Sequence, residues 1–169
     1  ARVDGRRNVS KAPAGTVDGA INGITGIEFE HTPENVGRLN LAHVNNIVNF
    51  PYAPLSVWGA RTLEVGGSYP YIQIRRLFML VEKSIFNSTH GFLFESNTAG
   101  LRLAIRSAVE NFLLTLFNTN HFTGGSPSEA FFVVCDSSNN TQATIDKGVV
   151  FVDVGIAPTK PAEFIVFRF

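Results

Sequence analysis

The residues with the greatest potential for catalysis are one cysteine and a histidine near it in sequence. Cys135 is the single cysteine of the chain, and it could act as a nucleophile with His121 and one of several asparagines. It ends an apolar run, residues 131–135, that predicts a buried strand, and cysteines buried in such strands are usually inert. No G-x-S-x-G elbow is present. A hydrolase is therefore the least supported interpretation.

Metal, cofactor and phosphate sites also lack a matching pattern. The four histidines are scattered singly, without an H-E-x-x-H or C-x-x-C motif. Asp136 and Asn139 lie in a polar cluster that lacks the spacing and final glutamate of an EF-hand loop, so the cluster predicts a turn. The sequence has no glycine-rich phosphate loop. We therefore expect no catalytic residue, no metal, no cofactor and no enzymatic activity.

The composition is that of an ordinary neutral globular protein, and it also permits self-association. The chain has 169 residues, which suits one domain, and its 14 basic and 14 acidic residues give a net charge of zero. A general nucleic-acid binder would carry a basic excess, whereas neutrality permits self-association. Fifteen phenylalanines, which have no polar group, belong in cores or interfaces. No apolar run is long enough to span a membrane, so we expect no membrane insertion.

Three helices and several strands would position these residues. Apolar residues recur at three- and four-residue spacing in residues 71–85 and 101–117. A third helix should begin at Thr32-Pro33-Glu34 and end near Asn40. We expect strands at 24–30, 55–58, 131–135, 149–156 and 163–169, a possible extended piece at 92–94, and either helix or strand at 44–50, with Pro51 and Pro54 breaking regular structure.

This order predicts an α+β fold with a small mixed, mostly antiparallel sheet and two or three flanking helices. Residues 1–23 are rich in Gly, Ala, Asn and Pro and are expected to form a linker or arm. The domain proper should then occupy residues 24–169. The chain begins with alanine, and we expect it to be a fragment of a longer protein.

The C-terminal strand is apolar on both faces. Phe164 and Val166 face one way, and Ile165, Phe167 and Phe169 face the other, after an extended, proline-containing stretch, residues 157–161. Such a strand must be buried in a sheet. It either completes the sheet of its own chain or adds to the sheet of a neighbour. The residues alone leave both alternatives open.

Five stretches occur in the order of one protein family. They are PAG (13–15), LNLAHVNNIVNFPYAPLSVWGARTL continued by YIQIRRLFMLVEKSI, EAFFVVCD (129–136), IDKG (145–148) and IAPTKPAEFIVFRF (156–169). Together they cover roughly residues 12–169 and resemble the conserved C-terminal domain of contractile tail sheath proteins. That family includes phage tail sheaths, R-type pyocins and related contractile injection systems.

The resemblance implies a structural and mechanical function. Copies of the chain would form a helical sleeve around an inner tail tube protein and contract to drive the tube through a target membrane. Baseplate and tail terminator proteins would be further partners. The protein would belong to a virion tail, or to a bacterial contractile particle assembled in the cytoplasm. The alternative is a phage baseplate or capsid component that does not contract.

The resemblance also assigns roles to residues. Trp58, Leu77, Phe78 and Val81 would be core, and Arg106 and Glu110, four residues apart on the second long helix, are the candidates for contact with the tube. Four charges lie in the best-matched motifs and would fix the sheet, with Glu163 paired to one of the arginines: Arg61, Arg75, Arg76 and Glu163. The strand exchanged with a neighbouring subunit would comprise Glu163, Phe164, Ile165, Val166, Phe167, Arg168 and Phe169.

Overall fold

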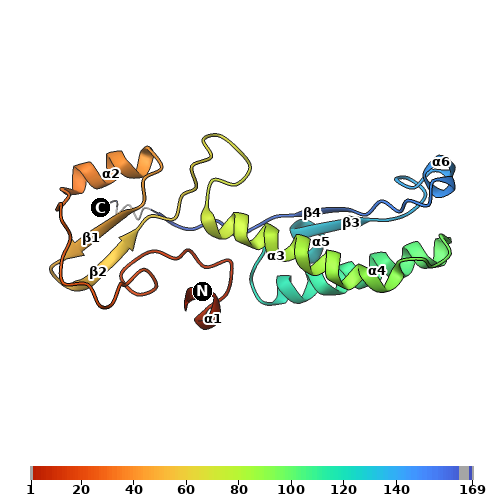
Figure 1. Cartoon of the computed structure of the whole chain (residues 1–169), viewed down its shortest axis with the longest axis horizontal. Coiled ribbons are helices and arrows are strands. Elements are labelled where there is room, and N and C mark those ends of the chain that lie inside the picture. The colour runs from red at the N-terminus through yellow and green to blue at the C-terminus, as the bar shows by residue number, and fades with distance from the viewer. Residues whose placement is uncertain (1, 164–167, 169) are drawn as a thin grey trace. The chain divides into compact units, whose positions relative to one another are not determined.

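The computed structural model describes residues 2–163 and residue 168. Within that part, the chain forms six α-helices, one short 3-10 helix and two antiparallel two-stranded sheets (Figure 1), which confirms the predicted α+β class. The strands expected in one sheet are thus divided between two. The described residues separate into two compact units, one formed by residues up to Leu77 together with those from Lys160, and one formed by Phe78–Thr159.

The first unit contains a β-hairpin and a well-capped helix. Its helices are α1 (Arg2–Arg6), α2 (Pro33–Leu41) and the start of α3 (Ile72–Thr89), and its strands are β1 (Asn46–Phe50) and β2 (Ala53–Trp58). α2 begins as predicted, because Thr32 Oγ1 accepts a hydrogen bond from the Asn35 amide at 3.3 Å and Pro33 occupies the first turn.

The two edges of the β-hairpin differ. The backbone of β2 is covered on its outer side: Val57 donates to Gly19 O at 2.9 Å and accepts from the Gly15 amide at 2.9 Å. Ile47 lies opposite Val57 in the register, so by the alternation of antiparallel ladders its N–H and C=O point away from β2. No described residue hydrogen bonds to those outward groups of Ile47. β1 is therefore an open edge within the described chain.

The second unit packs helices against a short sheet. Its elements are the rest of α3, the 3-10 helix η1 (His90–Phe92), α4 (Ala99–Asn118), α5 (Pro127–Ala130), β3 (Phe131–Val134), α6 (Gln142–Asp146) and β4 (Asp153–Ile156). β3 pairs antiparallel with β4, and α4 contacts β3. The buried face of α4 follows the predicted helical spacing and consists of Ile105, Val109, Leu113 and Leu116.

Four expectations for residues of the first unit and of α3 can be compared with the structure. Trp58 was expected in the core, but it is 38% exposed and makes an edge contact with Phe50 at a centroid distance of 4.7 Å, so the core assignment is wrong. Leu77 and Val81 are buried as predicted. Residues 24–30 form no strand, although their polar and apolar residues alternate. Pro54 was expected to break regular structure but lies inside β2, near a register shift where its missing N–H is tolerated.

Two expectations for the second unit are also wrong, each for a local reason. Residues 92–94 are not extended: η1 ends at Phe92, and Phe94 takes a left-handed conformation with φ 67°. The strand expected at residues 149–156 is shorter and begins at Asp153. Asn140 Oδ1 accepts a hydrogen bond from Phe151 N at 2.7 Å, and Asn140 Nδ2 donates to Phe151 O at 2.9 Å. Because the side chain of Asn140 binds both backbone groups of Phe151, they cannot pair with β3.

His121, after α4, makes the stability of the chain depend on pH. Its side chain is buried, and burial lowers the pKa of the imidazole because the charged form is disfavoured there. The unfolded chain then binds the proton first as the pH falls below about 6.5, so we expect the free energy of unfolding to fall as the pH drops below about 7, by at most about 1.4 kcal/mol per pH unit. Urea unfolding at several pH values measures this change, and His121→Gln should make the free energy of unfolding depend less on pH. An unchanged pH dependence in His121→Gln would show that His121 is not its cause.

Candidate functional site

An ion pair between distant parts of the first unit anchors the start of the C-terminal segment. The guanidinium of Arg61 binds the carboxylate of Glu163 with two bonds, Nη2–Oε2 at 2.7 Å and Nε–Oε1 at 3.3 Å. The side chains are only 17% and 16% exposed. The hydrogen bonds that Arg61 donates to Glu163 raise the pKa of Arg61 above its ordinary value. A two-pronged, half-buried pair fixes orientation better than an exposed ion pair does.

The backbone of Arg61 is held as firmly as its side chain. Asn45 Nδ2 donates to Arg61 O at 2.8 Å, and Arg61 N donates to Asn45 Oδ1 at 2.8 Å. The neighbouring Thr62 O lies 2.6 Å from His43 Nδ1. Asn45 and His43 come just before β1, and Arg61 and Thr62 come just after β2. These bonds therefore close the open end of the hairpin around the arginine.

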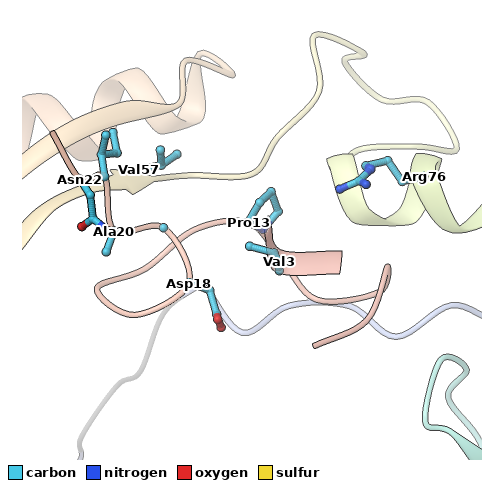
Figure 2. A pocket seen from close by; sticks show the side chains of 9 residues that line it. Val3, Pro13, Asp18, Ala20, Asn22, Val57 and Arg76 are labelled. Carbon is cyan, nitrogen blue, oxygen red and sulfur yellow. The ribbon is translucent and has the colours of Figure 1, made fainter. Parts of the chain in front are cut away.

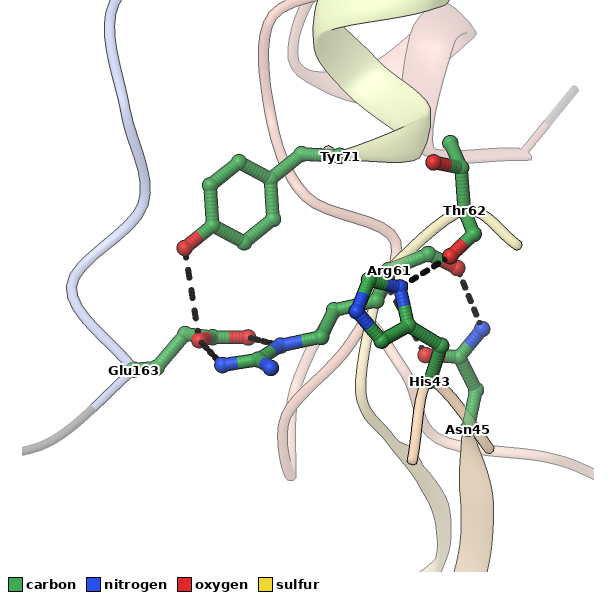
Figure 3. A network of polar contacts seen from close by, with 6 residues as sticks. All are labelled: His43, Asn45, Arg61, Thr62, Tyr71 and Glu163. Carbon is green, nitrogen blue, oxygen red and sulfur yellow. Dashed lines mark hydrogen bonds and ion pairs between the residues drawn. The ribbon is translucent and has the colours of Figure 1, made fainter. Parts of the chain in front are cut away.

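Tyr71 supports the pair from the start of α3. It forms an antiparallel bridge with Arg61, and Ile72 N donates to Ala60 O at 2.9 Å. Figure 3 shows the guanidinium of Arg61 and the hydroxyl of Tyr71 both turned toward Glu163, with Tyr71 Oη donating to Oε2 at 3.4 Å. Burial, followed by the charge of Glu163, raises the pKa of Tyr71, so its hydroxyl stays protonated and donates.

The long Tyr71–Glu163 bond gives a prediction of a small effect. Tyr71→Phe removes the hydroxyl and keeps the ring and the backbone bridge. We expect the free energy of unfolding to fall by less than about 1 kcal/mol, since a 3.4 Å bond is weak. Chemical denaturation checks this value. A loss larger than about 2 kcal/mol would mean that the hydroxyl, not the arginine, is the main partner of Glu163.

The side-chain bonds of Glu163 in this network go to a cation and a hydroxyl. The carboxylate of Glu163 is occupied by Arg61 and Tyr71, and no nucleophile lies among its partners. Cys135 is buried elsewhere, and burial raises the pKa of its thiol, which disfavours the reactive thiolate. In the part of the chain that the structure describes, no group of three His, Cys, Asp or Glu could hold a metal, and no helix could cross a membrane. The arrangement fixes a chain segment in place.

Comparison with known proteins identifies the family of the chain. The family model of the phage tail sheath C-terminal domain matches residues 64–169, which include Tyr71 and Glu163. The chain belongs to this family. The tail sheath protein of Vibrio phage KVP40 is 27% identical over 94% of this chain and 23% of its own length, and that of Enterobacteria phage T4 is 27% identical over 100% and 25%.

Solved structures give the same answer. A chain of the baseplate of the anti-feeding prophage (AFP) covers 99% of the sheath domain and 46% of its own length, with 33% identity and a TM-score of 0.92. A chain of the PVC sheath complex, an extracellular contractile injection system in its contracted state, covers 99% and 47%, with 37% identity and a TM-score of 0.91. The sheath domain thus spans about a quarter of the curated relatives and just under half of these chains.

The structure distributes the predicted site residues of the sheath domain over several places. Arg61 and Glu163 meet, whereas Arg75 stacks over Tyr69, 4.9 Å from the ring centroid, and Arg76 pairs with Asp4 of α1. Arg168 is exposed. The remaining residues of the expected exchanged strand lie outside the described residues and stay a prediction: Phe164, Ile165, Val166, Phe167 and Phe169.

Arg106 and Glu110, the expected tube contact, lie in the second unit. They pair with each other at 2.8 Å, four residues apart on α4, and their side chains are about two-fifths exposed. An exposed pair of this kind contributes little to stability, typically below about 1 kcal/mol. Their contact with a tube stays a prediction.

Sequence reasoning missed the residues that hold Arg61 in place. His43, Asn45 and Tyr71 act through bonds to the backbone or to a carboxylate far away in sequence, and no spacing rule signals such bonds. Gly59, two residues before Arg61, belongs to the same arrangement. Its φ is +148°, and a Cβ there would lie 2.7 Å from Asn45 Oδ1. The glycine leaves room for the amide that fixes Arg61.

Proposed function

We propose that this chain is the C-terminal domain of a contractile tail sheath subunit and that its C-terminal segment joins neighbouring subunits. Copies of the subunit would polymerise into a helical sleeve around an inner tail tube protein. Contraction of the sleeve would drive the tube through a target membrane. Membership of the sheath family and the likeness to a sheath complex in its contracted state support this proposal. The particle would be a phage tail or a bacterial contractile injection system.

Two features together support the proposal: the ion pair that holds the start of the C-terminal segment, and the open edge of β1. Glu163 holds the chain against Arg61 directly before the apolar residues 164–167. β1 offers the outward backbone groups of Ile47, which no described residue uses. An apolar strand and an open edge are the two halves of strand addition. In a sheath, the strand of one subunit would pair with β1 of the next.

This arrangement explains how subunits could move and stay connected. A strand that is anchored at Glu163 and hydrogen bonded to a neighbour acts as a tether, while other contacts between subunits change. The energy of contraction would be the difference between two sets of subunit contacts, so no nucleotide or other cofactor is needed and the protein would not be an enzyme. Baseplate and tail terminator proteins would bind the two ends of the sleeve.

The polar face of α4 is the proposed contact with the tube. Arg106 and Glu110 are exposed enough to exchange their mutual bond for partners on another protein. Reversing each charge singly, Arg106→Glu or Glu110→Arg, breaks this complementarity but leaves the buried face of α4 unchanged. We expect loss of co-assembly with the tube protein. Full sheath–tube assembly in both variants would remove these residues from the proposal.

Negative-stain electron microscopy of particles that contain the full parent protein tests the proposed function. Striated tubes should form with the native protein and not with a version that ends at Pro161, which lacks the anchor and the strand. Tubes in both would keep the sheath function and place the last strand in its own chain. Fixed assemblies without tubes in either case would favour the second candidate, a baseplate component. The likeness to a chain of the AFP baseplate is the observation that supports this candidate.

A further inference from the structure

The turn between α3 and α4 exposes apolar side chains in a fixed conformation. Leu93 is mostly exposed and Phe94 is fully exposed. Val149 is also exposed, and its carbonyl oxygen accepts a hydrogen bond at 3.3 Å from Nδ2 of Asn97, three residues after Phe94. We call Leu93, Phe94 and Val149 the apolar tip. Exposed apolar residues that cluster on one turn mark a contact surface more often than single exposed residues do.

The backbone of the tip is strained in a way that a contact would explain. Phe94 has φ 67°, a left-handed conformation that bulky residues rarely adopt and that asparagine or glycine adopts readily. The flanking residues are held by their own bonds: Thr98 Oγ1 accepts from the Leu101 amide at 3.2 Å, and Arg102 Nη1 donates to Asn97 Oδ1 at 2.8 Å. The turn thus holds an aromatic side chain outward at the expense of backbone energy.

The first unit contains a groove of matching character. It has a volume of about 530 Å³ and lies between α1, residues 13–22, β2 and the start of α3 (Figure 2). Its apolar lining comes from Val3, Pro13, Ala20, Ile21 and Val57. A groove of this size is comparable to small-molecule pockets of about 300–1,000 Å³, so it can receive two large side chains.

Charge favours the same pairing. At the groove, Asp18 bonds to Arg7 and Lys11, at 3.4 Å and 3.6 Å, and Arg76 bonds to Asp4. Asp18 and Arg76 line the groove, and together with their partners Arg7, Lys11 and Asp4 they sum to one positive charge. The tip carries the exposed Glu95 directly after Phe94. Opposite charges at the rims would orient the approach of the two surfaces.

We propose that the apolar tip of one subunit inserts into this groove of a second copy of the chain. The proposal rests on the proposed sheath function, in which copies of one subunit form a helical sleeve. A knob and a groove at different places on one chain make a head-to-tail contact, and repetition of such a contact builds an open helix instead of a closed dimer. The tip contact is separate from the strand exchange, because it uses neither β1 nor residues after Glu163.

Disulfide crosslinking in assembled particles tests the contact. The full parent protein would carry Phe94→Cys and Asn22→Cys, with Asn22 at the groove, in a Cys135→Ala background. Oxidised sheaths should give a ladder of covalent multimers on denaturing gels. The matched control replaces Asn22→Cys with Asn35→Cys, an exposed position on α2, and should give no ladder.

The outcomes separate the two proposals. Sheaths that form without a ladder, or a crosslink from position 94 to the tube protein, would overturn the tip contact and keep the sheath function. Failure of the native protein to form any sheath would overturn both.

A second variant separates assembly from folding. Phe94→Asn relieves the left-handed strain and removes the apolar side chain. The urea midpoint of the isolated chain should stay the same or rise, whereas the urea midpoint of sheath dissociation should fall. Leu103→Gln, at an exposed apolar site of α4 outside the tip, should leave sheath dissociation unchanged. Equal dissociation midpoints for Phe94→Asn and native sheaths would contradict the proposal.

Discussion

Glu163→Gln should abolish sheath assembly while the chain still folds. The substitution keeps the size of the side chain but removes the charge that binds the half-buried Arg61, so the guanidinium loses its two-pronged partner. We expect the free energy of unfolding to fall by about 1–3 kcal/mol, which a domain of this size can tolerate. The C-terminal segment would then lose its fixed exit toward the neighbouring subunit. Every subunit of the sleeve needs its C-terminal segment to point toward its neighbour. The loss of the Arg61–Glu163 pair is therefore repeated at every contact between subunits.

The measurement combines electron microscopy of particles with urea unfolding of the chain. For the urea measurement, Glu110→Gln is the matched control, because it breaks the more exposed Arg106–Glu110 pair and should change the free energy of unfolding by less than about 0.5 kcal/mol. Normal sheaths from Glu163→Gln would show that the ion pair does not position the exchanged strand. A chain that no longer folds would show that the pair belongs to the core of the first unit.

Gly59→Ala, which adds one methyl group beside the Arg61–Glu163 pair, should lower the folding stability of the chain strongly. A Cβ at this position would lie 2.7 Å from Asn45 Oδ1 and 3.2 Å from Asn45 Cα, and the φ of +148° is strained for alanine. Asn45 would have to move, and both of its bonds to the Arg61 backbone would be lost. We expect the free energy of unfolding to fall by about 2–4 kcal/mol.

Two other glycines provide the controls for that experiment. Gly37 lies inside α2, where an added Cβ would meet no atom of the surrounding structure within 4 Å, so Gly37→Ala should stabilise the chain by about 0.5–1 kcal/mol. Gly66 has φ +72° and also has open space around it, so Gly66→Ala reports backbone strain alone. If Gly59→Ala cost no more than Gly66→Ala, the close approach of Asn45 would not matter.

Elements with strong local signals could be predicted from the sequence. The helical spacing of apolar residues placed α3 and α4, and Thr32 with Pro33 placed the start of α2. The apolar run before Cys135 placed β3. In each case the signal lies within a few neighbouring residues, and packing agrees with it.

Features set by distant contacts could not be predicted. The length of β4 is limited by the side chain of Asn140, and the exposure of Trp58 follows from the hairpin having only two strands among the described residues. The sequence suggested that Glu163 pairs with an arginine, but the choice of Arg61 depends on Asn45, His43 and Tyr71. These residues are brought together only by the folded chain.

A cryo-EM reconstruction of the intact sheath, resolved well enough to trace strands, tests the central claim most directly. The claim is that the segment after Glu163 leaves its own chain and adds to a neighbour. We predict continuous density from the Arg61–Glu163 pair of one subunit to a strand alongside β1 of the next. Density that turns back onto β1 of the same subunit, or a β1 edge left uncovered, would contradict the claim.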